Sequence, residues 1–486
     1  MNKVLSGLQP TNLWENFEAL CGIPHPSKQE GKIRDYIVSF GKKLGLETIV
    51  DEVGNVIIRK PATPGMENRK GVILQGHIDM VPQKNNDTVH DFEKDPIRPR
   101  IDGEWVKATG TTLGADNGVG VAASMAILQS TDIPHGPVEM LCTIDEETGM
   151  TGAFGIKGGF LKGDILLNLD SEEEGILCIG CAGGTNANVT FSYTTQPVPA
   201  GMKAYTLEIK GLKGGHSGVE INLGRGNSNK LLLRFLYHSA KKHGMRLVSI
   251  DGGSLRNAIP RESNAVVLIP ADKEKCFLEC VQNFETDIQH ELKTVDPGVK
   301  FSALPAAQPG EMFDLDSQNK MINALYALPN GVMRMSNDME NLVETSTNLA
   351  IVKSENGKVY IQCLLRSSVD SAKDDLEYMM AALFELAGAD ANFSGKYPGW
   401  KPNVDSPILK EMKEIYAAKF GKAPEIGAIH AGLECGLLGG VYPNWDMISF
   451  GPTILHPHSP DEKVNIASVQ KFWDFLVDTL KNVPVK

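Results

Sequence analysis

Short apolar strands alternate with helices along the first 180 residues, and this order constrains the fold more than any other feature of the sequence. Apolar strands at 72–74 and 138–144 are separated by a helical stretch at 119–128. Strands that are joined through helices run parallel, and helices then cover the sheet. The order therefore predicts an α/β fold with a mostly parallel sheet.

A second series of strands and helices begins near residue 185 and ends in the turn-rich segment 395–402. The first pattern then resumes, with helices at 408–420 and 466–480. We predict one catalytic domain, formed by residues 1–184 and 398–486, that is interrupted by an inserted α+β domain at 185–397. No internal repeat is visible in the sequence.

Composition and charge argue against two classes of partner. The chain has 48 basic and 60 acidic residues, so its formal net charge is −12. A nucleic-acid-binding protein needs a basic face for the phosphate backbone, and we expect no such partner. No apolar run approaches the roughly 18 residues of a membrane span, and the first residues lack the apolar segment of a secretory signal. We expect a cytoplasmic protein with no membrane partner.

Acidic residues and histidines gather where the predicted strands end, or where a helix follows such a strand. They are His77, Asp79, Asp116, Glu146, Glu147, Asp170, His456 and His458. The carboxyl ends of parallel strands form the edge at which open α/β sheets bind ligands. Carboxylates and imidazoles at one edge are costly unless a cation lies among them. Two histidines with several carboxylates favour zinc or a similar ion over calcium or magnesium.

The set of donors is larger than one tetrahedral zinc ion needs. It suits two metals about 3.5–4 Å apart that share one carboxylate, and Asp116 fits that position because a helix N-terminus stabilises its charge. Residues two apart on an extended chain point to the same side, so Asp79 can accept a hydrogen bond from His77. Glu146 and Glu147 diverge, so one can bind a metal while the other acts as a general base.

Five segments resemble the motifs of a family of two-zinc metallopeptidases that includes aminoacylases, carnosinases and bacterial tripeptidases and dipeptidases. In chain order they are GHIDMV (76–81), GADNG (114–118), DEETG (145–149), NLDSE (168–172) and HSPDE (458–462). The segment KGGHSG (213–218) resembles the lid or dimerisation domain of the same family. The resemblance implies a di-zinc catalytic domain with an inserted lid/dimerisation domain, and a homodimer.

The resemblance also implies a ligand set of two Zn²⁺ per subunit, with Co²⁺ or Mn²⁺ as substitutes. The first zinc would be held by His77, Asp116 and Asp170, and the second by Asp116, Glu147 and His458. Spacing alone leaves His456 open as an alternative to His458. In the family the ligand histidine stands four residues before a glutamate, and Glu462 gives this spacing to His458.

For catalysis, the resemblance implies that Asp79 orients His77 and that Glu146 is the general base and later the proton donor. The implied activity is hydrolysis of dipeptides with a free N-terminus, including Xaa-His and β-alanyl-histidine. Two alternatives stay open: an N-acyl-amino-acid deacylase that uses the same metals, and an inactive peptide-binding protein. A serine hydrolase is not expected, because no Gly-x-Ser-x-Gly segment is present.

Three more residues resemble groups that contact substrate in the family. His216 matches a lid histidine that reaches across the dimer to stabilise the oxyanion, and Asn257 and Arg366 match substrate-binding groups. A guanidinium suits the terminal carboxylate of a dipeptide. The competing interpretations are a polar loop histidine for His216 and a surface salt bridge for Arg366. Glu434 could meet the free amine of the substrate, or it could pair with His430 on one face of a helix.

Overall fold

The computed structural model describes residues 4–486, and their contacts divide the chain into two compact units. Unit 1 runs to Gly180 and resumes at Pro402–Ala428 and Leu433–Lys486. Unit 2 consists of Cys181–Lys401 together with Ile429–Gly432. The predicted roles of a catalytic and a lid domain remain predictions. Within the described residues, no helix combines the length and the apolar character needed to cross a lipid bilayer.

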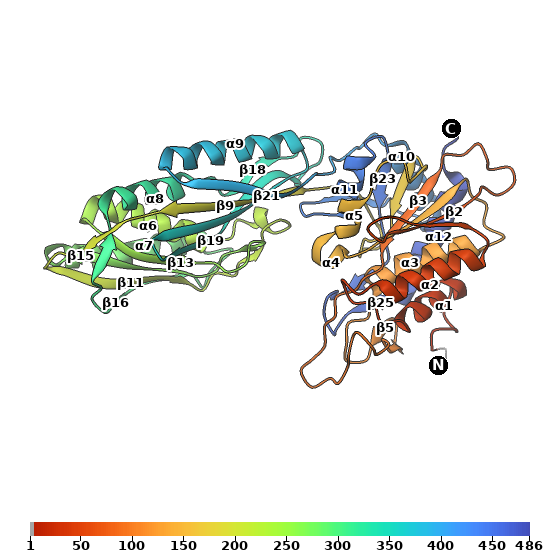
Figure 1. Ribbon diagram of the computed structural model, residues 1–486, viewed down its shortest axis with the longest axis horizontal. Helices are drawn as coiled ribbons and strands as arrows, with labels where there is room; N and C mark the ends of the chain where they lie inside the picture. Colours follow the sequence, from red (N-terminus) through yellow and green to blue (C-terminus); the bar gives the residue numbers. More distant parts are fainter. Residues whose placement is uncertain (1–3) are drawn as a thin grey trace. The chain divides into compact units, whose positions relative to one another are not determined.

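Unit 1 is built on an eight-stranded sheet (Figure 1). In spatial order its strands are β1 (Glu47–Val50), β2 (Val56–Lys60), β6 (Val138–Thr143), β3 (Val72–His77), β7 (Ile165–Asn168), β23 (Asp446–Ser449), β8 (Ile176–Cys181) and β22 (Glu425–Ile429). The central strands β6, β3, β7 and β23 pair in parallel, whereas β1 pairs antiparallel with β2, β2 with β6, and β8 with β23. Every residue of β3, β6 and β7 is buried, as expected for parallel strands that are covered on both faces. The predicted α/β class is therefore confirmed.

The helices of unit 1 lie on both faces of this sheet. They are α1 (Thr11–Cys21), α2 (Gly31–Lys43), α3 (Ala115–Gln129), α10 (Pro407–Phe420) and α12 (Ile466–Asn482), with the shorter α4 (Glu146–Gly149), α5 (Thr151–Gly155) and α11 (Glu434–Val441). Helix α3 packs on β3 and against α1, and α10 packs on β23. Figure 1 shows α1, α2 and α3 on one side of the sheet and α10 on the other.

The ends of these elements follow local side-chain chemistry. Ser406 accepts a hydrogen bond from the N–H of Leu409 and so caps α10, which begins one residue before the predicted start. The apolar segment 53–58 suggests a strand, but β2 begins only at Val56. The reason is Asp51, whose Oδ1 accepts the N–H groups of Val53 and Gly54 at 3.1 and 2.9 Å and so holds a turn there.

A small four-stranded sheet of unit 1 carries the C-terminal loop. Its order is β24 (Ile454–Leu455), β25 (Lys463–Asn465), β5 (Trp105–Ala108) and β4 (Pro99–Asp102). Strands β24 and β25 pair antiparallel, so the loop 456–462 between them is anchored at both ends.

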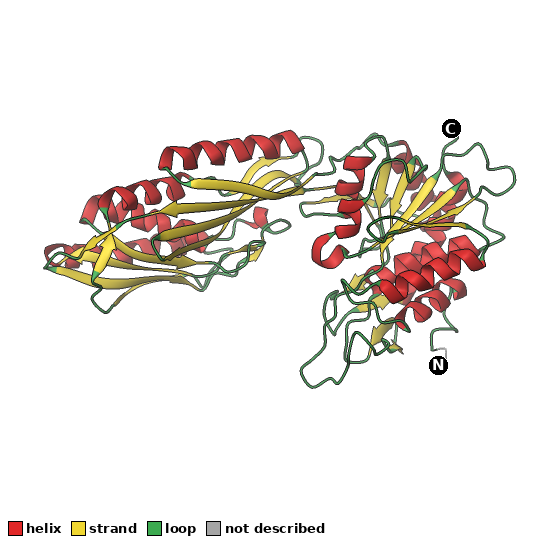
Figure 2. Cartoon of the chain, in the orientation of Figure 1, coloured by secondary structure: helices red, strands yellow, loops and turns green. Residues whose placement is uncertain are grey.

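Unit 2 contains a nine-stranded sheet. Along its path lie β16 (Lys300–Pro305), β11 (Met202–Lys210), β15 (Ser263–Pro270), β13 (Arg246–Gly252), β19 (Val343–Glu355), β20 (Lys358–Ser367), β9 (Gly183–Ser192) and β21 (Asp390–Tyr397), and β18 (Gly331–Met335) pairs with β19. Two short pairs, β10 (Thr195–Pro197) with β17 (Glu311–Phe313) and β12 (Gly215–His216) with β14 (Ala258–Ile259), complete its strands. The helices α6 (Ser228–His243), α7 (Glu274–Leu292), α8 (Leu315–Ala327) and α9 (Asp370–Ala387) form one layer (Figure 2).

The unit 2 sheet consists of two halves with the same β–α–β–β–α–β order. The first half is β11, α6, β13, β15, α7 and β16, and the second is β9, α8, β19, β20, α9 and β21. The first half is inserted between β9 and α8 of the second. Antiparallel pairing of β13 with β19 joins the halves into one sheet. The sequence shows no repeat, because the halves share the order and pairing of their elements rather than a visible pattern of residues.

Aromatic rings fill the core between the first half's sheet and its helices. Phe235 on α6 is buried, and its ring lies 5.9 Å from that of Phe277, 5.3 Å from that of Phe284 and 4.7 Å from that of Phe301, measured between centroids. Tilted and edge-to-face contacts of this kind add to the burial of apolar area.

We expect Phe235→Ala to lower the free energy of unfolding by about 3–5 kcal/mol, because it removes a buried ring and leaves a cavity that the neighbouring rings cannot fill. Urea denaturation followed by circular dichroism measures the change. Leu386→Ala is the control, since Leu386 on α9 is 86% exposed; its effect should stay within about 0.5 kcal/mol. Equal effects of the two changes would contradict the assigned core.

Candidate metal centre

Five side chains from separate segments meet at the carboxyl edge of the central strands in unit 1. His77 ends β3, Asp116 lies in the first turn of α3, and Asp170 follows β7. Nε2 of His77 lies 3.1 Å from Oδ1 of Asp116 and 3.3 Å from Oδ1 of Asp170. Nε2 of His458 lies 3.2 Å from Oδ2 of Asp116 and 2.9 Å from Oε2 of Glu147. Asp116 therefore presents one oxygen to each imidazole, as a shared ligand would.

The chemistry of these groups fits a bound cation. Oε1 of Glu147 and Oδ1 of Asp170 are buried and accept no hydrogen bond from the described part of the chain. Acceptors that face one another in this way need a positive charge between them. Two triads, His77–Asp116–Asp170 and Asp116–Glu147–His458, hold their donor atoms close enough to bind a metal ion. Imidazole with carboxylate is a donor set that zinc and related ions accept.

The pKa values of His458, His77 and Asp170 are all raised, which shows that the site favours bound protons and hence positive charge. Hydrogen bonds with Asp116 and Glu147 raise the pKa of His458 to about 11. Burial alone would lower the pKa of His77, but the charge of Asp170 and the hydrogen bond with Asp116 raise it well above its ordinary value. Burial, together with the charges of Asp116 and Glu147, raises the pKa of Asp170 to about 7.

Asp79 contacts one metal-binding residue, His77, and the backbone of Glu146 and Glu147. Nδ1 of His77 lies 3.1 Å from the carbonyl oxygen of Asp79 and 3.4 Å from its carboxylate, so the carbonyl is the closer partner. The Asp79 carboxylate accepts the backbone N–H of Glu146 at 2.9 Å and of Glu147 at 3.3 Å. Burial alone would raise the pKa of Asp79, but the hydrogen bond and charge of His77 lower it to about 2. This one carboxylate thus connects the ring of His77 to the turn that carries both glutamates.

Glu146 begins α4 beside the metal-binding groups. Its carboxylate forms a third possible triad with His77 and Glu147. Burial, with the charges of Asp170 and Glu434, raises the pKa of Glu146 well above its ordinary value. A carboxyl with a raised pKa beside the ligands is suited to take up and release a proton.

Glu462 holds together the two segments that carry Asp116 and His458. It is buried, and its carboxylate accepts the N–H groups of four consecutive residues at the start of α3: Leu113 (2.7 Å), Gly114 (3.0 Å), Ala115 (2.7 Å) and Asp116 (3.3 Å). Sequence reasoning used Glu462 only to choose between two histidines. The spacing of four residues between His458 and Glu462 was the only sign in the sequence that Glu462 matters. The sequence could not identify its hydrogen-bond partners, because they are about 350 residues away along the chain.

The two C-terminal histidines have different surroundings. His458 contacts Asp116 and Glu147, whereas His456 is exposed and belongs to none of the described metal-binding groups. The proposed helical pair of His430 with Glu434 is wrong. Helix α11 begins at Glu434, so His430 lies outside it, and the Nε2 atom of His430 is 2.7 Å from Oγ of Ser346 in unit 2.

Three residues predicted to contact substrate belong to unit 2. Nδ1 of His216 accepts the backbone N–H groups of Gly218 and Val219 at 3.2 Å each, so the neutral ring carries its proton on Nε2. Burial, with the charge of Arg366, lowers the pKa of His216. Asn257 is exposed, and its carbonyl accepts the N–H of Ser217, next to His216.

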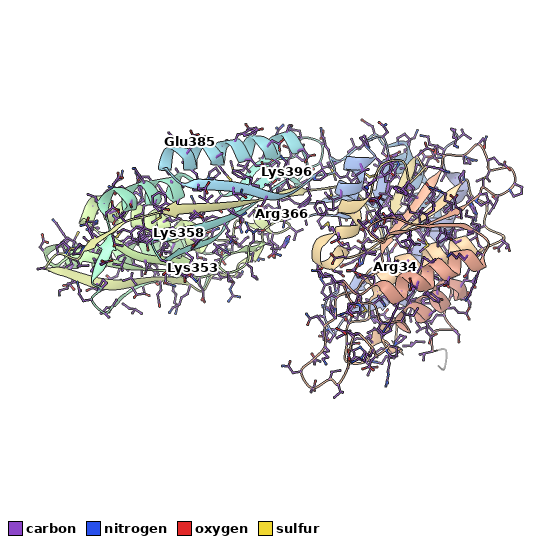
Figure 3. All side chains as sticks on the ribbon, viewed as in Figure 1. Arg34, Lys353, Lys358, Arg366, Glu385 and Lys396 are labelled. Atoms are coloured by element: carbon purple, nitrogen blue, oxygen red, sulfur yellow. The ribbon has the colours of Figure 1, made fainter. Side chains whose placement is uncertain are left out.

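Arg366 is a buried guanidinium that forms no ion pair with any acidic residue in the described part of the chain. Its exposed fraction is 5%, its Nε has no hydrogen-bond partner within residues 4–486, and its nearest described polar contact is the hydroxyl of Tyr397 at 3.5 Å. The surface salt bridge is therefore wrong. A Cβ on Gly218 would lie 3.1 Å from Nε of Arg366 and 3.0 Å from Cε1 of His216, so glycine allows the two side chains to approach. Figure 3 shows Arg366 and Lys358 at opposite ends of β20.

We expect Glu462→Gln to weaken metal binding by about 10–100-fold, because the segments with Asp116 and His458 would no longer share one carboxylate. Competition with a chromogenic chelator measures the affinity, and circular dichroism checks the fold. Asp461→Asn, an exposed neighbour, removes the same charge and should leave the affinity unchanged. If Glu462→Gln binds the metal as tightly as the protein without the substitution, Glu462 does not hold the two ligand segments together.

Comparisons with known proteins identify the family of the chain. Residues 73–482 match the model of peptidase family M20/M25/M40. The chain is 49% identical over 482 residues to the cytosol non-specific dipeptidase of Escherichia coli (strain K12), with 99% of each chain covered.

Among solved structures, the aminoacylhistidine dipeptidase of Vibrio alginolyticus is similar, with 52% identity and a TM-score of 0.96 over 99% of this chain and 98% of that one. Aminopeptidase PepT of Bacillus cereus shares the fold, with a TM-score of 0.62 at 17% identity over 98% and 99% of the two chains. The resemblance inferred from the five motifs is thereby confirmed, and the chain belongs to peptidase family M20/M25/M40.

Proposed function

We propose that this protein is a metal-dependent dipeptidase that hydrolyses dipeptides with a free N-terminus, including Xaa-His and β-alanyl-histidine. The observation that carries the proposal is the position of Asp116, whose two carboxylate oxygens face His77 and His458 separately. The names of two similar proteins, a cytosol non-specific dipeptidase and an aminoacylhistidine dipeptidase, support the substrate class.

The proposed cofactor is two Zn²⁺ per subunit, with Co²⁺ or Mn²⁺ as substitutes. His77, Asp116 and Asp170 would hold one ion, and Asp116, Glu147 and His458 the other. When bound, such ions lower the pKa of water and polarise the scissile carbonyl. The unpartnered oxygens of Glu147 and Asp170 support this assignment.

Glu146 is the proposed general base. It takes the proton of the attacking water and later gives it to the leaving amine. Its raised pKa and its place beside His77 and Glu147 support this role. Asp79 would keep His77 in the tautomer that leaves Nε2 free for the metal, and it would hold the turn of Glu146.

The unit 2 residues are proposed to recognise the substrate. The Nε2–H of His216 would donate to the oxyanion, Arg366 would bind the terminal carboxylate, and Asn257 would add a polar contact. The buried guanidinium supports this most directly, because a buried charge without a partner is unfavourable until an anion binds. We further propose a homodimer that acts in the cytoplasm.

We expect chelation to abolish hydrolysis of Gly-His and β-alanyl-histidine, and zinc to restore it. Glu146→Gln should lower kcat by about 10²–10⁴-fold while metal content stays the same, because proton transfer is lost and the ligands remain. Rates on dipeptides, tripeptides and N-acetyl amino acids, with metal analysis of each sample, test both statements. Preference for the acetylated compounds would instead indicate a deacylase, and no turnover with metal bound would contradict catalysis.

We expect Arg366→Ala to raise KM for dipeptides by about 10–100-fold, the worth of a hydrogen bond to a charged group. The corresponding dipeptide amides, which lack the terminal carboxylate, should be affected far less. Lys358→Ala is the matched control, because it removes a positive charge from the exposed end of the same strand (Figure 3). An equal rise in KM for acids and amides would count against carboxylate binding by Arg366.

A further inference from the structure

A row of buried polar side chains crosses the four parallel strands of unit 1 just before the strand ends. Oγ of Ser449 on β23 donates to Oδ1 of Asn168 on β7 at 2.5 Å, and Nδ2 of Asn168 donates to Oε1 of Gln75 on β3 at 2.5 Å. Nε2 of Gln75 then donates to Oε2 of Glu434 at 2.7 Å. The hydroxyl of Thr143 on β6 donates to the same oxygen at 2.6 Å. The whole row is directed toward one carboxylate, that of Glu434.

This row lies next to the metal-binding groups. Gln75 precedes His77 by two residues on β3, so their side chains point to the same side, and Thr143 pairs in register with His77. The charge of Glu434 interacts with those of His77, Asp170 and Asp79, and with that of Glu146. Glu434 is therefore a neighbour of the ligands, although it belongs to none of the described metal-binding groups.

The two oxygens of Glu434 differ. Oε2 accepts two hydrogen bonds, whereas Oε1 is buried and accepts none from any described residue. The side chain is 1% exposed, and no described ion pair joins it to a lysine or an arginine. A buried carboxylate oxygen without a donor is unfavourable. A ligand that completes it must bring a hydrogen-bond donor, and the surrounding carboxylates favour a cationic one.

We propose that Oε1 of Glu434 binds the ammonium group of the dipeptide and thereby selects substrates with a free N-terminus. This inference rests on the proposed function and extends it. In an α-dipeptide the ammonium is attached to the carbon next to the scissile carbonyl, so its partner must lie close to the groups that act on that carbonyl. Glu434 meets this condition through its hydrogen bonds to Gln75 and Thr143.

Burial explains why such a contact would discriminate. An ion pair shielded from water is stronger than an exposed one. An N-acyl substrate has no positive charge at this position, so Oε1 would stay unpaired in its complex. A site built around a polar group rejects analogues that lack the partner group far more strongly than an apolar pocket can.

The test compares Ala-His with propionyl-His, which differs only in lacking the amine. For each substrate kcat and KM are measured with the zinc-loaded protein, with Glu434→Gln and with Glu172→Gln. Glu172 is the matched control, because it is a partly exposed carboxylate two residues after Asp170 whose charge acts on the same ligands. Metal content and circular dichroism are recorded for every sample.

In Glu434→Gln we expect kcat/KM for Ala-His to fall by about 10–100-fold, mainly through KM, with little change for propionyl-His. The ratio of kcat/KM for Ala-His to kcat/KM for propionyl-His should therefore fall in Glu434→Gln and stay unchanged in Glu172→Gln. Equal losses on both substrates, or an equal change of the ratio in both variants, would overturn the proposal and leave Glu434 as a structural residue.

If Glu434→Gln does not fold or loses metal, Glu434→Asp gives the same comparison, since it withdraws the carboxylate by one methylene and keeps its charge. A lower ratio supports the proposal, and an unchanged ratio overturns it. If the protein without any substitution hydrolyses neither substrate, the proposed function itself is overturned. This result differs from an unchanged ratio in the variants, which overturns only the role of Glu434.

Discussion

Mutual repulsion among buried carboxylates at one edge of a parallel sheet is the constraint on which the rest of the site depends. Asp116, Glu147 and Asp170 face each other and two imidazoles, and within residues 4–486 one buried oxygen of Glu147 and one of Asp170 lack a donor. Without a cation this arrangement is unfavourable, because burial removes the water that would otherwise solvate the charges. The raised pKa values of Asp170 and His458 express the same demand for positive charge.

The surrounding chain stabilises this strained set of charges with hydrogen bonds from the backbone. Asp79 receives two N–H groups from the turn of Glu146, and Glu462 receives four from the start of α3. Each carboxylate thereby connects a ligand to a second segment of the chain. A metal site of this kind is defined as much by the groups that hold the ligands as by the ligands themselves.

The two units differ in the buried polar groups that they leave unpaired within the described residues. The site in unit 1 is rich in acceptors, and Glu434 adds one more unpaired oxygen. Unit 2 holds two donors, the buried guanidinium of Arg366 and a neutral His216 whose proton lies on Nε2.

The sequence by itself determined the α/β class, the order of strands and helices in unit 1, and the ligand candidates, because alternation, strand ends and short motifs are local properties of the chain. Local patterns also placed most helix ends, where capping residues such as Ser406 act within three residues. They did not reveal the duplicated halves of unit 2, since these repeat an arrangement of elements and pair through β13 and β19.

Only the tertiary structure distinguished the surroundings of His458 from those of His456. It also showed that Arg366 is buried, and it identified the hydrogen-bond partners of Glu462 and Glu434. Each of these outcomes depends on contacts between residues that are far apart in the chain, as between Glu462 and Leu113 or between Glu434 and Gln75. Burial turns such contacts into strong constraints, because a carboxylate or guanidinium that leaves water must find its partner in another segment of the fold or in a ligand.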